Sequence, residues 1–160
     1  MKKTLQVVVM NKSSFIDGFN IQESIRQFID NIATAKLISL TDVVLKTCDG
    51  PWMENQLRAL SSAYGYSYKT YSLDPWLGND AAEIALNDMI IDGHEEKDKQ
   101  CIIYMDHGES ILAHERVIKK LISAKYSVTI FFVDEEGIID ETPKIVDYNY
   151  NIFDGVMIVL

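Results

Sequence analysis

Short apolar runs alternate with amphipathic segments along most of the chain. Five runs rich in β-branched and aromatic residues have the length of strands, and we predict strands at residues 5–10, 42–46, 66–72, 101–105 and 127–133. Between these runs, apolar residues recur at spacings of three and four, which is typical of a helix with one buried face. The pattern therefore predicts strands that are joined by helices.

Four helices are expected between the strands. Their predicted starts are Asn20, Pro51, Asp80 and Ser110. Asn20 and Asp80 each precede a glutamate by three residues, the spacing of a capping box. Gly65 stands where a left-handed cap would end the second helix. The fourth helix is expected to run to Ser123. His107 and His114, seven positions apart, are expected on or near this helix and on a shared face.

Strands that alternate with helices form a mainly parallel sheet with helices on both faces. The C-terminal part differs, because short strand candidates at 138–139, 145–146 and 156–160 have no helix between them. We therefore predict a three-layer α/β fold, a single domain over residues 1–160, with a C-terminal antiparallel extension at one edge of the sheet.

Composition and charge narrow the classes of function. The chain has 160 residues, 48% of them hydrophobic, which suits one ordinary core and excludes intrinsic disorder. Its net charge of −9 lies wholly in the second half, where sixteen acids face seven bases. Such a surface repels phosphate backbones, so we expect no nucleic-acid partner. No apolar run is long enough to span a membrane and no secretory signal is found, so a cytoplasmic protein is expected.

The usual cofactor motifs are missing from the sequence. The eight glycines are never closer than thirteen residues, so neither a dinucleotide-binding fingerprint nor a Walker A loop can form. The two cysteines, Cys48 and Cys101, and the three histidines match no zinc spacing. We therefore predict no nucleotide binding, no cofactor and no metal.

One stretch nevertheless resembles the core of AAA+ ATPases. It runs from Asp42 through Gly50-Pro51-Trp52-Met53-Glu54 to Leu73. Cys101–Asp106 is similar to that family's second strand, which ends in an acidic residue. Where the family has Gly-Lys-Thr, this chain has Trp52-Met53-Glu54, and Asp106-His107 replaces the Asp-Glu pair. The resemblance therefore implies a nucleotide-free relative, although any α/β chain with this order of elements would show the same likeness.

A second resemblance provides an alternative. Asp17-Gly18-Phe19-Asn20 is similar to the Asp-Gly-x-Asn motif that opens NYN/PIN-type ribonuclease domains. That likeness implies a Mg²⁺-dependent ribonuclease with Asp17, Asp80, Asp88 and Asp106 as its carboxylates, because hard cations prefer oxygen ligands. Asp17 follows the first predicted strand by seven residues, whereas the motif places its aspartate at the strand end. We therefore expect Asp17 to lie away from Asp106.

Acidic and aromatic residues near the C-terminus favour a binding role. The segment from Asp134 to Asp154 carries seven acids against one lysine, and three aromatics accompany them. Trp52 and Trp76, beside prolines in expected loops, are further candidate anchors, since tryptophan and tyrosine often dominate interfaces. The predicted partner-binding residues are Asp134, Glu135, Glu136, Tyr148, Tyr150 and Phe153.

Together these features predict a non-catalytic, acidic regulator that binds a protein with a basic surface. Small acidic chains rich in Ile, Lys, Asn and Tyr are similar to bacteriophage products that inhibit host enzymes. The AAA+ likeness implies that the partner is a host AAA+ ATPase, such as an ATP-dependent protease or a helicase. The NYN/PIN-like ribonuclease stays as the alternative, and a subunit completed by a partner strand is a third reading.

Overall fold

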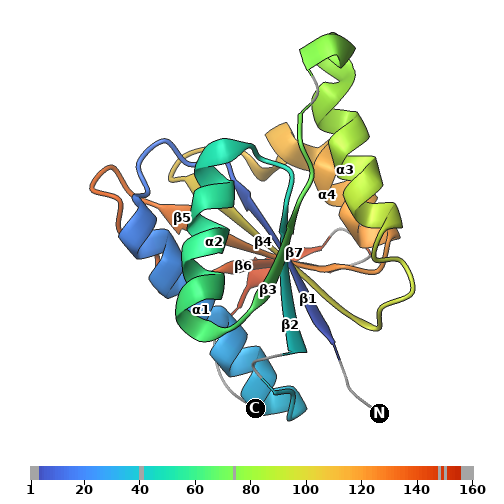
Figure 1. Ribbon diagram of the computed structural model, residues 1–160. Helices are drawn as coiled ribbons and strands as arrows, with labels where there is room; N and C mark the ends of the chain where they lie inside the picture. Colours follow the sequence, from blue (N-terminus) through green and yellow to red (C-terminus); the bar gives the residue numbers. More distant parts are fainter. Residues whose placement is uncertain (1–3, 40–41, 74, 148, 150, 156–160) are drawn as a thin grey trace.

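A computed structural model describes residues 4–39, 42–73, 75–147, 149 and 151–155 of the chain. Helices and strands alternate along most of this length (Figure 1). The strands are β1 (Leu5–Asn11), β2 (Val43–Thr47), β3 (Ser67–Thr70), β4 (Asp98–Asp106), β5 (Ser127–Val133), β6 (Lys144–Val146) and β7 (Ile152–Asp154). The α-helices are α1 (Gly18–Lys36), α2 (Pro51–Tyr64), α3 (Ala81–Ile91) and α4 (Glu115–Ser123), and 3-10 helices η2 (Pro75–Asp80) and η3 (Ile111–His114) precede the last two.

The strands form one mixed sheet in the order β3-β2-β1-β4-β5-β6-β7. The first five strands in this order are parallel, and β6 and β7 add antiparallel pairs beyond β5. The predicted three-layer α/β fold with an antiparallel C-terminal extension is confirmed. A helix follows each of β1, β2, β3 and β4 before the next parallel strand, which explains the alternating pattern in the sequence.

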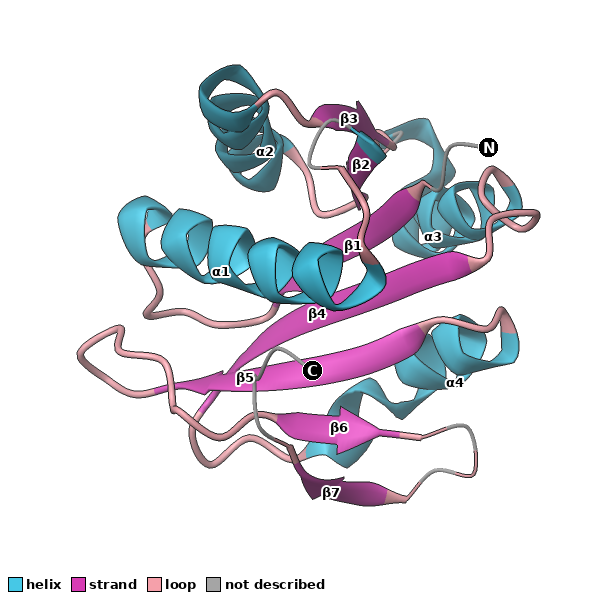
Figure 2. Ribbon diagram, turned by 90° about the horizontal axis from the view of Figure 1, so that it is seen from below, coloured by secondary structure: helices cyan, strands magenta, loops and turns pink. Residues whose placement is uncertain are grey.

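Helices cover both faces of the sheet (Figure 2). On one face α1 and α2 pack over a buried cluster that includes Leu5, Val7 and Val9 of β1. On the other face α3 and α4 cover a second cluster that includes Val8 and Met10 of the same strand. Because neighbouring residues of a strand point to opposite faces, both clusters draw on one continuous apolar run.

An aromatic cluster joins α1 to the centre of the sheet. The ring of Phe131 in β5 stacks on Tyr104 of β4 with centroids 5.5 Å apart, and it meets Phe28 of α1 edge-on at 6.4 Å. The hydroxyl of Tyr104 donates to Ser24 Oγ in α1 at 2.8 Å. Tyr104 is fully buried, so this hydrogen bond satisfies its hydroxyl inside the core.

Several predicted boundaries are wrong. Asp17 rather than Asn20 caps α1, since its side chain accepts from the backbone of Asn20, so the helix starts earlier. Asp80 precedes α3 but makes no capping bond through its side chain. The helix expected over 110–123 is divided into η3 and α4, and His107 lies in the turn after β4, so His107 and His114 share no helix face.

The C-terminal strands also differ in part from the prediction. Ile139 forms only an isolated bridge with Val133. The segment around 145–146 is β6 as expected, whereas β7 lies where we predicted no strand. The candidate at 156–160 lies outside the described residues. None of the described helices has the length and apolarity that a membrane span requires.

Candidate functional site

The loops that follow the carboxyl ends of the parallel strands are where α/β proteins usually bind ligands. In this sheet, the chain leaves β1 toward β2 on one side and returns to β4 on the other, so the topological switch point lies between β1 and β4. Hydrogen bonds tie these loops together. The backbone N–H of Asn11 donates to Asp49 Oδ2 at 2.5 Å, and Ser13 Oγ donates to Asp106 Oδ1 at 2.5 Å.

Asp106 holds the loop between β1 and α1 in place. Besides the bond from Ser13, its two carboxylate oxygens accept from the backbone N–H of Ser14 at 3.1 and 3.0 Å. Ser13 Oγ in turn accepts from the backbone N–H groups of Phe15 and Ile16. A phosphate at this position would need donors of this kind, and the chain's own carboxylate already engages them. The arrangement is consistent with the absence of phosphate-binding motifs from the sequence.

Cys48, which follows β2, is buried, and the neighbouring Asp49 is half-buried. Burial raises the pKa of the Asp49 carboxyl, although the bond from Asn11 and the charge of Lys12 oppose the shift. Burial also raises the pKa of the Cys48 thiol to about 12, and the nearby Asp49 charge adds to this. A thiol of that kind is protonated at neutral pH and therefore unsuited to act as a nucleophile.

The half-buried Asp49 carboxyl should make stability depend on pH. Its pKa is raised in the folded protein above the ordinary 3.8, so its favourable contribution is complete below that value and is lost as pH rises through the folded pKa. We expect Asp49→Asn, which keeps an acceptor for Asn11, to be more stable than the wild type at pH 7. The gap should close below about pH 4. Urea unfolding of both proteins from pH 3 to 8 measures it, and a gap that widens toward acid pH would contradict the assignment.

The segment between β5 and β6 folds back onto this edge. Asp134 Oδ1 accepts from the backbone N–H groups of Glu136 and Ile138, each at 2.9 Å, and closes a turn. His107 Nε2 lies 2.8 Å from Asp140 Oδ2 and ties the segment to the end of β4. Gly137 has φ of +83°, and a Cβ at that position would lie 2.8 Å from the carbonyl oxygen of Phe15. Residues 134–140 are therefore packed against the loop that follows β1.

Four large apolar side chains are exposed on these joined segments. They are Phe15 (46% exposed), Phe19 (74%), Trp52 (43%) and Ile138 (55%). Phe15 lies beside Gly137. The start of α1 contacts α2, where Gln22 Nε2 donates to Gln56 Oε1 at 2.6 Å. The acidic residues Asp17, Glu54, Glu135 and Glu136 belong to the same segments. We call these eight residues the carboxyl-edge surface.

The carboxylates proposed for a nuclease have separate surroundings. Asp106 binds the β1–α1 loop, while Asp17 at the start of α1 accepts from the backbone N–H of Asn20 at 2.7 Å. Asp80 and Asp88 belong to η2 and α3, on the other face of the sheet. Within the described ranges, no group of three or more His, Cys, Asp or Glu side chains is arranged to hold a metal ion.

The residues predicted to bind a partner fall in two places. Asp134, Glu135 and Glu136 lie at the carboxyl edge, where Asp134 stabilises the turn and the two glutamates are exposed. Phe153 lies on β7 at the far edge of the sheet and is 47% exposed. Tyr148 and Tyr150 lie outside the described residues. Other acids of the segment also have local partners, since Asp147 closes the β6–β7 turn and Asp154 pairs with Lys144.

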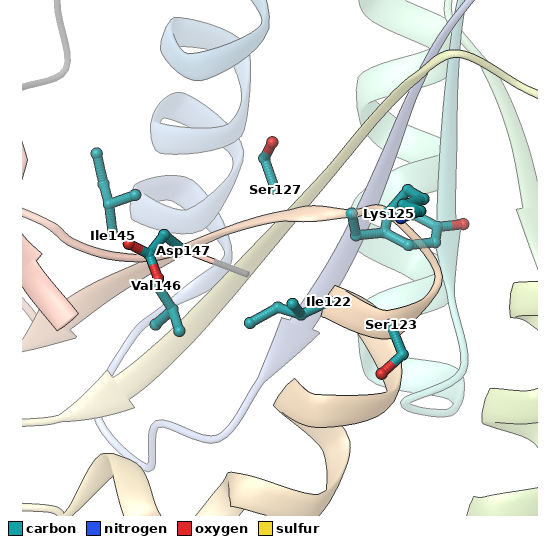
Figure 3. Close-up of a pocket in the computed structure, with 8 residues that line it drawn as sticks. Ile122, Ser123, Lys125, Ser127, Ile145, Val146 and Asp147 are labelled. Carbon is teal, nitrogen blue, oxygen red and sulfur yellow. The ribbon is translucent and has the colours of Figure 1, made fainter. Parts of the chain in front are cut away.

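A cleft of about 590 Å³ lies at the amino-terminal end of β5, away from the carboxyl ends of the parallel strands (Figure 3). It is bounded by the end of α4, the turn into β5 and strand β6, with Ile122, Tyr126 and Val146 among its lining. The Asp147 carboxylate in its wall is engaged by the backbone N–H groups of Asn149 and Asn151. The Asp147 carboxylate therefore serves the β6–β7 turn.

Sequence reasoning pointed to Trp52 and to the acids 134–136, but it missed Phe15, Phe19 and Ile138 as members of one surface. The one hint in the sequence was that each of them stands close to a glycine or an aspartate in a segment that could form a loop. The carboxyl-edge surface has to be interpreted from its own geometry, because the chain matches no protein-family model, no curated protein and no solved structure.

Proposed function

We propose that this chain is a non-catalytic regulator that binds a protein partner through the carboxyl-edge surface. The observation that carries the proposal is that Phe15, Phe19, Trp52 and Ile138 are exposed on three segments that follow the carboxyl ends of β1, β2 and β5. Contiguous exposed apolar side chains rimmed by polar ones typically mark interaction sites. Tryptophan is also enriched among the residues that contribute most to binding energy.

The charge of the same surface favours a basic partner. Glu135 and Glu136 are exposed, and neither has an ion-pair partner within the part of the chain that the structure describes. Acids around an apolar centre steer a basic partner toward the correct orientation and repel acidic competitors. The AAA+ resemblance of the sequence makes a host AAA+ ATPase or protease the class of partner to test first. Inhibition would follow if the chain covers a surface that this enzyme needs.

Hydrogen bonding at the edge supports a rigid binding surface rather than a reactive centre. The Asp106 carboxylate accepts from the backbone N–H of Ser14 in the β1–α1 loop, Asp49 accepts from that of Asn11 at the end of β1, and Asp17 accepts from that of Asn20 in the first turn of α1. These bonds fix the loop that carries Phe15 and the start of the helix that carries Phe19. Binding to a preorganised surface loses less conformational entropy, so such bonds contribute to affinity indirectly.

The charge contribution can be tested by association kinetics. The partner is first captured from a lysate of the native host on the immobilised chain and identified by mass spectrometry. We expect Glu135→Gln/Glu136→Gln to slow association with this partner about threefold or more at low salt, and the difference should fade as the Debye length falls below ~10 Å. Dissociation should change little, because exposed rim charges act mainly on encounter.

The matched control is Glu95→Gln/Glu96→Gln, which removes the same charge from the turn after α3. Equal slowing by both pairs would show that only net charge matters and would contradict a steered docking surface. Mg²⁺-dependent RNA cleavage by the wild type that Asp106→Asn abolishes would instead establish the ribonuclease alternative.

A further inference from the structure

A groove of about 380 Å³ adjoins the carboxyl-edge surface. One wall is a stripe of α1 that includes Asn20 and Glu23, and the other is the segment that ends at Glu141. Ile138 and Ile139 contribute apolar surface to the groove, and the buried Phe131 lies beneath them. Ile138 belongs both to the groove and to the carboxyl-edge surface, so the two are continuous.

The groove carries excess negative charge. Glu23 pairs with Arg26 at 3.1 Å, and Asp140 pairs with His107 at 2.8 Å. Arg26 also pairs with Asp30 at 3.0 Å and lies over the ring of Tyr64 in α2, so its charge is shared with groups outside the groove. Glu141 is exposed and has no ion-pair partner among the residues described.

We propose that this groove binds an arginine side chain of the protein partner. The inference rests on the proposed function and names the chemical group that the partner presents. The aliphatic part of an arginine suits the apolar surface of Ile138 and Ile139, while its guanidinium can reach the carboxylate of Glu141. The Nδ2 of Asn20 donates to the carbonyl of Gly137, which leaves its Oδ1 as a further acceptor.

Arginine fits this groove better than lysine for a geometric reason. A guanidinium offers five N–H donors in a fixed plane, so it can serve carboxylate and amide acceptors on both walls at once. An ammonium group is compact and strongly hydrated, and it gains less from acceptors spread across a groove. The shape and the charge of the groove therefore both select the longer, planar cation.

The probe is N-acetyl-arginine N-methylamide, titrated into ¹⁵N-labelled protein and followed by NMR. We expect saturable shifts of the groove amides, including those of Ser24, Ile139 and Glu141. The citrulline analogue, which has the same shape without the charge, should produce no such shifts, and the lysine analogue should bind more weakly. Glu141→Gln should weaken arginine binding by roughly tenfold, the effect of one charge-assisted hydrogen bond.

The matched variant is Glu95→Gln, which removes one exposed carboxylate outside the groove and should leave arginine binding unchanged. Equal shifts with citrulline, equal weakening by Glu95→Gln, or shifts centred on another part of the protein would each overturn the groove proposal. If arginine fails to bind while partner binding still depends on Phe19 and Trp52, only the groove proposal fails. If arginine binds but those two variants leave partner binding intact, the proposed function fails instead.

Discussion

Replacing both Phe19 and Trp52 by alanine should weaken binding of the protein partner by roughly 100-fold or more. Aromatic side chains at the centre of an interface commonly contribute about 2 kcal/mol or more each, and 1.4 kcal/mol corresponds to tenfold in affinity. The loss should lie mainly in faster dissociation, because these rings act after water has been excluded from the contact. Surface plasmon resonance with the captured partner measures both rate constants.

Folding of this double variant should be little affected. Phe19 is 74% exposed and Trp52 is 43% exposed, so neither ring is a main part of the core. Ile91→Ala provides the control, since Ile91 is an exposed apolar residue at the end of α3, away from the carboxyl-edge surface. Unchanged dissociation in the double variant, with normal melting, would remove these residues from the interface.

Phe131→Ala should destabilise the protein by about 3–5 kcal/mol, the range found for removing a buried phenylalanine side chain. The ring is 2% exposed and contacts both Tyr104 in the sheet and Phe28 in α1. Its loss would leave a cavity between the centre of the sheet and the helix that carries Phe19. Urea unfolding monitored by circular dichroism gives the change in the free energy of unfolding.

Phe153→Ala is the matched aromatic control for this measurement. Phe153 lies on the edge strand β7 and is 47% exposed, so its removal should cost less than about 1 kcal/mol. A similar loss of stability in both variants would contradict the central position given to Phe131. If the Phe153→Ala variant bound the partner more slowly than the wild type, the interface would extend to the edge strand β7.

The parallel core was predictable because its strands are buried on both faces. Leu5–Met10 and Cys101–Met105 are nearly continuous apolar runs, and such runs leave little ambiguity about burial. The start of β4 was missed, since Asp98 and Lys99 are polar although Lys99 is buried. Strand β7 was missed for the opposite reason, because all three of its residues are exposed and carry no alternation of apolar and polar positions.

The candidate site was predictable only in fragments. Glu135 and Glu136 were expected at an interface from local charge, and Trp52 from its place beside a proline. Their association with Phe15, Phe19 and Ile138 depends on strand order, which places the ends of β1, β2 and β5 at one edge. The pattern of residues within one segment does not determine the order of the strands in the sheet. The contact between Phe15 and Gly137 joins residues more than 120 positions apart.

Hydrogen–deuterium exchange of the free chain and of its complex with the captured partner tests the central claim most directly. We predict new protection in residues 11–19, 51–56 and 134–141, the segments that form the carboxyl-edge surface and its groove. Residues 122–127 and 145–147, the segments that line the cleft at the amino-terminal end of β5, should exchange at the same rate in both states. Protection of that cleft with no change at the carboxyl edge would contradict the account.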